Sequence, residues 1–159
     1  MGDNGMTAGR WLVVTIIAVT ALFAAAQWWF QTRAYYVPVE AASVAVALAD
    51  GGTEDIPVSG FTGIDADTSP LRYRGCFAVD VDLDTLTARA VAYEDPTPLV
   101  APGWFDCFDA TAIGAALEAG QARAFLSQTE IRPGADRVVA IYPDGRGFAW
   151  HQWNGSLDP

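Results

Sequence analysis

The most hydrophobic stretch of the chain runs from Trp11 to Phe30 without a charged residue and is almost entirely apolar. Roughly 20 such residues in an α-helix cross a bilayer core about 30 Å thick, and no second stretch of this kind follows. The sequence therefore predicts one transmembrane helix over 11–30 that holds the protein in a lipid bilayer. We expect a cytoplasmic tail over 1–10, a juxtamembrane linker over 31–38 and one extramembrane domain over 39–159.

Arginines and amphipathic aromatic rings flank this stretch, as is typical of a retained anchor: Arg10 and Trp11 at one end, and Trp28, Trp29, Arg33, Tyr35 and Tyr36 at the other. The alternative is a signal peptide, because residues 24–26 offer the small side chains that a signal peptidase prefers. Cleavage near Ala26 would release the domain as a secreted protein. We expect the anchor, because apolar residues continue past that site.

Cys76 and Cys107 are the two cysteines of the chain, and both have aromatic neighbours. We expect each to lie against a packed core and the two to form one disulfide, which would stabilise the domain by about 3.5 kcal/mol; two unpaired thiols are the alternative. The short tail and the cysteine pair both favour a domain outside the cytoplasm. The cysteines are too far apart for a C-x-x-C redox pair, and with one histidine they provide too few ligands for zinc.

The composition excludes several function classes. The chain contains no lysine, which removes P-loop, kinase and Schiff-base chemistry, and it has neither a G-x-S-x-G nor an H-E-x-x-H motif. Its net charge of −10 indicates an acidic surface that does not bind nucleic acid or hold anionic lipids electrostatically. We predict no enzymatic activity, no cofactor and no bound metal.

The first half of the domain reads as strands and turns. Residues 43–50 alternate as a strand does and end in an Asp-Gly-Gly turn, and residues 61–70 are rich in turn formers. Residues 71–81 and 86–93 then resemble a pair of strands. Prolines between 96 and 102 interrupt regular structure.

The second half reads as one short helix and a hairpin. Asp109 is suited to cap a helix that begins at Ala110 and ends near Gly120. Three strands are expected over 123–131, 137–142 and 147–153, and a Pro-Asp-Gly-Arg turn joins the last two. The fold class is therefore α+β, with a mostly antiparallel sheet and one short packed helix.

Two acidic clusters have the spacing of possible sites. Asp65 and Asp67 resemble the start of a calcium loop, but Pro70 stands where an EF-hand needs glycine. Arg72 and Arg74 would share one strand face. We expect the nearby aspartates to neutralise them internally, and a fork that binds a carboxylate or phosphate is the alternative.

The second acidic cluster, Asp80, Asp82 and Asp84, alternates along an extended segment. An exposed strand end or turn is the expected structure, and a metal site is the alternative.

The aromatic strand at the end of the chain places large side chains on both faces. Alternation sends Trp150 to one face and His151 and Trp153 to the other. One face belongs to the core, and the other is covered by the helix or presented to a protein partner. A lone His151 is expected to be a packed residue, and a hydrolase built on it is the alternative.

Three segments resemble an uncharacterised family of single-anchor membrane proteins found in alphaproteobacteria: GIDADTSPLRYRGCF, APGWFDCFDATAIGAALEAG and DRVVAIYPDGRGFAWHQWN. The resemblance implies a bacterial inner-membrane protein with a periplasmic domain, and it implies no activity. Members sometimes carry the label of histidine kinase, which one histidine, no lysine and the short chain contradict.

We therefore expect a non-enzymatic accessory or interaction protein of an inner-membrane or envelope assembly. The alternative is a periplasmic sensor that binds a small anion. The candidate contact residues for a ligand or partner are Asp65, Asp67, Arg72, Arg74, Trp150, His151 and Trp153.

Overall fold

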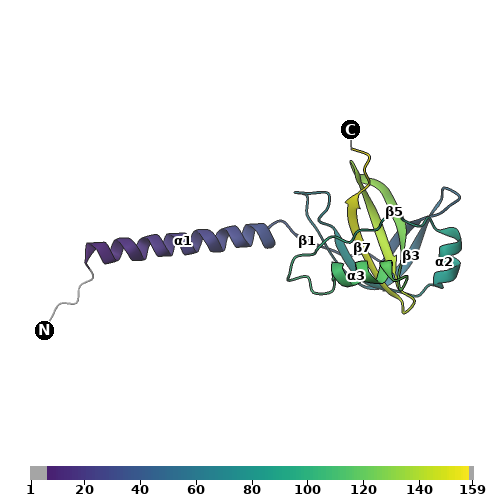
Figure 1. The fold of residues 1–159 in the computed structure, drawn as a ribbon, viewed down its shortest axis with the longest axis horizontal. Helices are drawn as coiled ribbons and strands as arrows, with labels where there is room; N and C mark the ends of the chain where they lie inside the picture. Colours follow the sequence, from purple (N-terminus) through teal and green to yellow (C-terminus); the bar gives the residue numbers. More distant parts are fainter. Residues whose placement is uncertain (1–6, 158–159) are drawn as a thin grey trace. The chain divides into compact units, whose positions relative to one another are not determined.

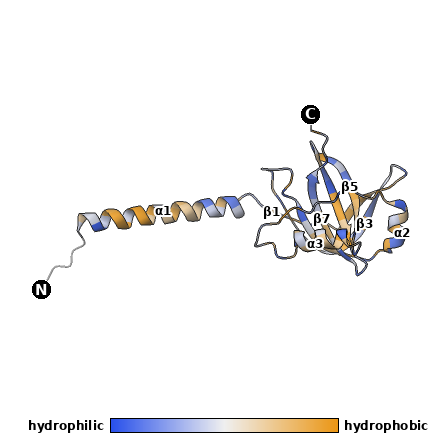
Figure 2. Ribbon diagram, in the orientation of Figure 1, coloured by the Kyte–Doolittle hydropathy of each residue, from blue (hydrophilic) through white to orange (hydrophobic). Residues whose placement is uncertain are grey.

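The structure is a computed structural model that describes residues 7–157. The chain forms two compact units that divide between Tyr35 and Tyr36. In the first, α1 (Ala8–Thr32) is an uninterrupted helix without buried residues (Figure 1). At 1.5 Å per residue it is about 37 Å long, and Figure 2 shows apolar residues along most of it. Its length and composition suit a membrane span or a signal sequence. Most of the predicted tail over 1–10 falls outside the described residues.

The second unit contains two helices, α2 (Leu83–Arg89) and α3 (Ala110–Glu118), and an antiparallel sheet. In the described residues the sheet has seven strands: β1 (Val37–Val39), β2 (Ser43–Ala47), β3 (Thr53–Asp65), β4 (Arg74–Val79), β5 (Arg123–Arg132), β6 (Ala135–Ile141) and β7 (Arg146–Trp153). Their order is β1-β3-β4-β7-β6-β5, and β2 pairs with the first part of β3. The predicted α+β class and antiparallel sheet are confirmed.

The sheet curls until its two ends meet. Residues 90–93 lie between β2 and β5, through the bridges Leu48↔Ala90 and Ala92↔Phe125. The Val91 amide donates to the Ala47 carbonyl, and the Leu126 amide donates to the Val91 carbonyl. This curvature gives the sheet an enclosed inner face and an outer face, and successive residues of each strand alternate between them.

Each face has its own core. The inner face buries a cluster that includes Val44, Val46, Ile56, Phe77, Val79, Leu86, Phe125, Val139, Ile141 and Ala149. The outer face buries a second cluster against the segment that contains α3: Ile64, Cys76, Phe105, Phe108, Ile113, Val138, Ala140 and Trp150. We call residues 94–118 the outer layer, because they cover this second cluster.

Two predicted segments differ in the structure. The predicted strand over 86–93 begins within α2, because the Asp82 carboxylate caps that helix by accepting a bond from the Thr85 amide at 2.7 Å. The predicted turn region over 61–70 begins as strand, because β3 continues to Asp65 between β1 and β4. The sheet's pairing therefore overrides the turn residues of this segment.

The predicted helix at Ala110 and the β6–β7 hairpin are confirmed. The Asp109 carboxylate accepts bonds from the Thr111 and Ala112 amides, and the helix ends before Gly120, whose φ is +68°. The last two strands pair in register from Ala135↔Trp153 to Ile141↔Gly147. This hairpin lies between β4 and β5 in the sheet and carries His151.

Candidate functional site

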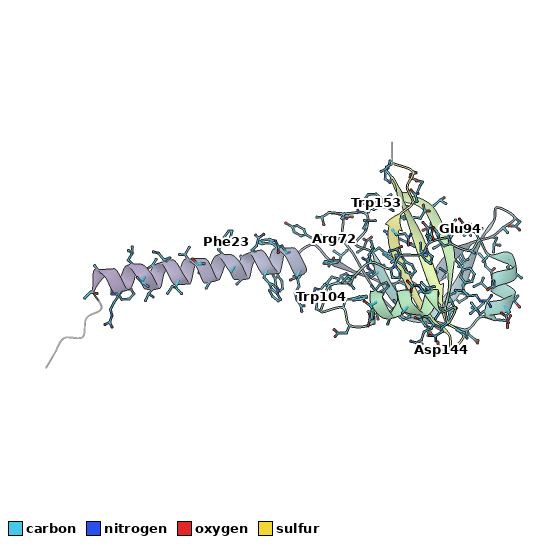
Figure 3. All side chains as sticks on the ribbon, viewed as in Figure 1. Phe23, Arg72, Glu94, Trp104, Asp144 and Trp153 are labelled. Atoms are coloured by element: carbon cyan, nitrogen blue, oxygen red, sulfur yellow. A yellow bond between two sulfur atoms is a disulfide. The ribbon has the colours of Figure 1, made fainter. Side chains whose placement is uncertain are left out.

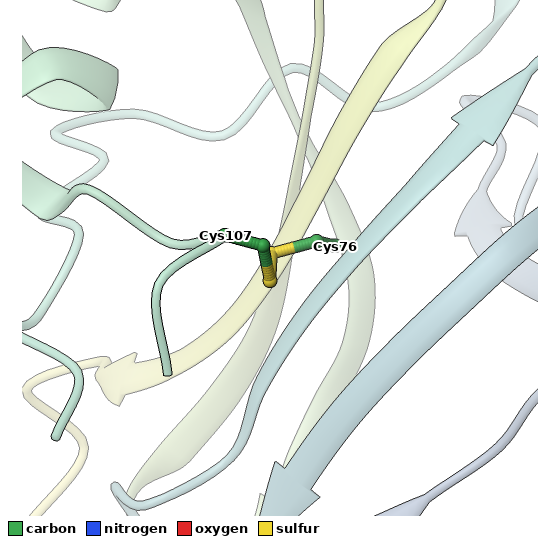
Figure 4. The surroundings of a disulfide bond; sticks show 2 residues. All are labelled: Cys76 and Cys107. Atoms are coloured by element: carbon green, nitrogen blue, oxygen red, sulfur yellow. A yellow bond between two sulfur atoms is a disulfide. The ribbon is translucent and has the colours of Figure 1, made fainter. Parts of the chain in front are cut away.

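The disulfide fastens the outer layer to the sheet. Cys76 lies in β4, and Cys107 lies in the loop before α3 (Figure 4). The predicted pairing is confirmed, with the two Cα atoms 6.3 Å apart. Cys76 is buried in the outer cluster, as expected, whereas Cys107 is exposed. The cysteines are therefore structural.

Arg74 is a second fastening between the same parts. Its guanidinium is buried and donates to four main-chain carbonyls: Nε to Leu99 at 2.7 Å, Nη1 to Leu71 at 2.7 Å and Tyr73 at 2.6 Å, and Nη2 to Val100 at 3.2 Å. Burial lowers the pKa of Arg74 to about 10. The alternative of an arginine fork on one strand face is wrong, because only Arg74 of the pair lies in a strand and its Nε, Nη1 and Nη2 atoms donate to main-chain carbonyls.

Arg72 lies in the loop before β4, with its guanidinium carbon 5.5 Å from the centre of the Tyr36 ring. Its Nη1 is buried without a hydrogen-bond partner among residues 7–157. The two aspartates do not pair with these arginines in the described contacts: Asp67 lies 3.4 Å from Arg132, and Asp65 accepts a bond from the Ala66 amide. The predicted ion pairs between these aspartates and arginines are therefore not among the described contacts, and each side chain has another neighbour.

His151 is enclosed on the inner face and is 2 % exposed. Its Nδ1 lies 2.8 Å from the Pro70 carbonyl, and its Nε2 accepts a bond from Arg137 Nε at 3.0 Å. The imidazole ring stacks on the Tyr73 ring with 4.6 Å between their centres. The guanidinium carbon of Arg137 lies 4.2 Å from the centre of the same Tyr73 ring. Burial lowers the pKa of His151 to about 4, and the Arg137 charge contributes. The imidazole is neutral near pH 7, and both nitrogens are occupied.

Trp150 points to the outer face and is fully buried, so it is a core residue. Its Nε1 donates to Gln152 Oε1 at 3.0 Å, and the same oxygen accepts a bond from the Thr97 amide of the outer layer at 2.8 Å. Trp153 is 52 % exposed at the end of β7 (Figure 3). The predicted alternation of this strand is confirmed, and Trp153 alone of these three presents a large surface to solvent.

The second acidic cluster is not an extended row. Asp82 caps α2, Asp84 lies in its first turn 3.3 Å from Arg123, and Asp80 precedes both. In the described part of the chain, no three acidic, cysteine or histidine side chains gather as a metal site would require.

An open groove of about 880 Å³ lies between α3, residues 92–98 and the start of β5. Six of its seventeen lining residues are alanine or glycine: Ala92, Ala110, Gly114, Ala115, Ala122 and Ala124. The polar groups at its edge include Asp95, Glu118 and Arg123. Sequence reasoning missed this groove; the available signal was the small residues of α3 that face away from Ile113 and Ala116, the buried residues of the helix.

Comparison with known proteins gives one match. The family model described as a family of unknown function, DUF6446, matches residues 44–158, which is more than half of the chain. No curated protein and no solved structure matches.

Proposed function

The chain belongs to the family of unknown function DUF6446, and we propose that it is a non-enzymatic interaction protein anchored by α1 in the bacterial inner membrane. Its domain lies in the periplasm and belongs to a larger envelope assembly. The groove beside α3 receives a segment of the partner protein. The single observation that carries this proposal is the groove, an open and partly apolar surface of the domain.

The side chains that most often act as catalysts, the histidine and the two cysteines, are bonded to other groups of the domain, which supports a role without catalysis. A general base needs a free nitrogen or oxygen within reach of a substrate proton. The two ring nitrogens of His151 contact Pro70 and Arg137, and the ring is buried. The two cysteines of the chain form the disulfide, so neither is available as a thiolate nucleophile.

The groove has the dimensions and chemistry of a binding surface. Ligand sites commonly measure about 300–1,000 Å³ and combine apolar walls with a few polar groups. The alanine and glycine residues of the walls leave room for apolar side chains of a partner. Asp95 and Glu118 supply negative charge, whereas the third charged lining residue, Arg123, is paired with Asp84 at 3.3 Å. The occupant we propose is a protein segment with apolar side chains and a basic residue.

The anchor and the disulfide support the compartment. Aromatic residues at both ends of a long apolar helix are typical of retained spans, and disulfides persist in the periplasm but not in the cytosol. Resemblance to alphaproteobacterial single-anchor proteins agrees with both. A signal peptide cut near Ala26 would instead give a soluble periplasmic protein.

The test is purification of the full chain, tagged at its C-terminus, from gently solubilised native membranes. We expect one protein to accompany it at near-equal abundance across salt concentrations. Gly114→Phe places a large ring in the groove, whereas Gly114→Ala adds a methyl group that meets no atom within 4 Å. Loss of the partner from the phenylalanine variant alone supports the proposal. Recovery of the protein alone, or of the same partner with both variants, contradicts it.

A second candidate function is binding of a small anion at Arg72, whose buried Nη1 has no partner in the described residues. Arg74 does not contribute, because its donors are occupied. Phosphate and citrate would then raise the melting temperature of the protein but not that of Arg72→Gln. A flat response to both anions counts against this candidate.

A further inference from the structure

We propose that the loop over 98–104 docks on the bilayer that holds α1, with Val100 inserted among the lipid headgroups and upper acyl chains. This inference rests on the proposed function in one respect, because it needs α1 to be a retained anchor. It is independent of the groove and of any protein partner.

The loop presents an apolar tip on a rigid support. Val100 is 83 % exposed, the largest exposure among the large hydrophobic residues of the described chain. The carbonyl groups of Leu99 and Val100 accept bonds from Arg74, which is itself buried. The main chain at the tip is thus held by the sheet while the valine side chain points away from every core cluster. A side chain presented in this way loses little conformational freedom when it enters an apolar environment.

The loop lies beside the first residues of the domain. The Trp104 ring packs edge-on against Tyr36, with 5.7 Å between centres, and Arg72 lies over the same tyrosine. Val37, the next residue, is 57 % exposed. Figure 3 places Arg72 and Trp104 at the same side of the domain, away from Asp144. Side chains from three segments far apart in the sequence therefore gather around Tyr36.

Chain connectivity keeps this surface near the membrane. The anchor helix ends at Thr32, and the domain begins at Tyr36. Four residue steps span at most about 14 Å when fully extended, so a spanning α1 restrains Tyr36 to that distance from the bilayer surface. A tether this short gives a high effective concentration, and a weak contact then suffices for docking. Tryptophan and tyrosine are the side chains that favour the headgroup region.

The charge of the protein specifies the kind of lipid contact. The net charge of −10 repels an anionic surface, so apolar insertion rather than ion pairing must hold the loop. Docking should therefore survive high salt, which screens charges but does not weaken apolar burial. It should also weaken as the anionic fraction of the lipids rises.

The experiment uses the full chain in lipid nanodiscs of phosphatidylcholine with a spin label at Gly103→Cys. Gly103 is exposed and a Cβ there meets no atom within 4 Å, and both native cysteines are already paired. A label at Asp144→Cys, in the β6–β7 turn, is the matched control. Collisions of the label with oxygen, relative to a water-soluble nickel complex, report its depth. We expect a several-fold higher ratio at position 103 than at position 144, unchanged by salt.

Val100→Asp in the chain labelled at position 103 removes the apolar tip without touching a core residue. The ratio should fall to the value at position 144, while the melting temperature of the domain stays the same. Equal ratios at positions 103 and 144 in the unmutated loop would overturn the docking proposal. Release of the protein from membranes by an alkaline wash would instead overturn the anchor, so the two failures are distinguishable.

Discussion

The two faces of the strands β4, β7 and β6 are buried in different ways. The inner face is closed by the sheet itself, because regular alternation along curled strands places Val139 and Ala149 in a common interior. The outer face is closed by the outer layer, which contains only one helix, of nine residues, and long irregular stretches. Irregular segments make few main-chain bonds of their own, so their order depends on side-chain fastenings.

The fastenings are three separate devices. They are the disulfide at Cys76, the bonds of Arg74 to the Leu99 and Val100 carbonyls, and the bond from the Thr97 amide to Gln152. Among the described residues no covalent link crosses the inner face. At one end of this face, the buried His151 ring contacts the Pro70 carbonyl. The comparison predicts that the sheet is the more stable framework and that the outer layer, which carries part of the groove, opens before it.

Removing the disulfide should have the largest effect. Its loop of 31 residues predicts a loss of about 3.5 kcal/mol in the free energy of unfolding for Cys76→Ser with Cys107→Ser. Amide hydrogen exchange should accelerate more in residues 94–109 than in β6, because the outer layer opens first. Reduction of the native protein serves as the control and should give the same pattern. Equal acceleration in both regions would refute the comparison.

The next prediction concerns His151, the buried histidine of the inner face. Between pH 6.5 and 4 the unfolded chain binds a proton at His151 that the folded chain does not, because its pKa falls from its ordinary value to about 4. The free energy of unfolding should therefore decrease as the pH falls through this window, by about 3 kcal/mol in total.

Its matched variant is His151→Gln, which does not titrate. Denaturant titrations at several pH values should show a smaller decrease in stability for this variant than for the native protein between pH 6.5 and 5, at a lower absolute value. A variant that keeps the full slope of the native protein would assign the pH dependence to other groups.

Arg74→Met should lower stability by about 2 kcal/mol, because it leaves main-chain carbonyls of the outer layer without their donor. The loss should appear as faster exchange near Leu99 and Val100 with little change in β6. Arg74→Lys retains a charge but cannot reach four acceptors in a fork, so an intermediate loss is expected. A methionine variant as stable as the native protein would show that the arginine is dispensable for closure.

Gly114→Ala should have the smallest effect and the opposite sign. Replacing glycine within an exposed helix stabilises it by roughly 0.5–1 kcal/mol, and the added methyl meets no atom within 4 Å. Thermal melting in nanodiscs measures the gain. Gly145→Ala is the contrasting variant, because its φ of +85° and a Val79 carbonyl 2.7 Å from the added Cβ make it destabilising. A loss of stability at position 114 would show that the added methyl group disturbs the packing of α3 within the outer layer.

Sequence reasoning was accurate wherever a local signal had a single interpretation. The cap at Asp109, the hairpin before Arg146 and the alternation at Trp150 are all local patterns, and the structure has them. It failed at residues 86–93, where alternation and helical spacing overlap and the cap at Asp82 decided the outcome. It also failed for Arg74, because the partners Leu99 and Val100 are about 25 residues away.

The sequence by itself determined the apolar helix, the α+β class and the identity of the disulfide partners, because each depends on local composition or on there being two cysteines. The tertiary structure decided the rest. The curled sheet encloses His151. The outer layer supplies carbonyl groups that accept hydrogen bonds from Arg74, and it forms one side of the groove. These outcomes depend on contacts between residues distant in the chain, whose register no local pattern specifies.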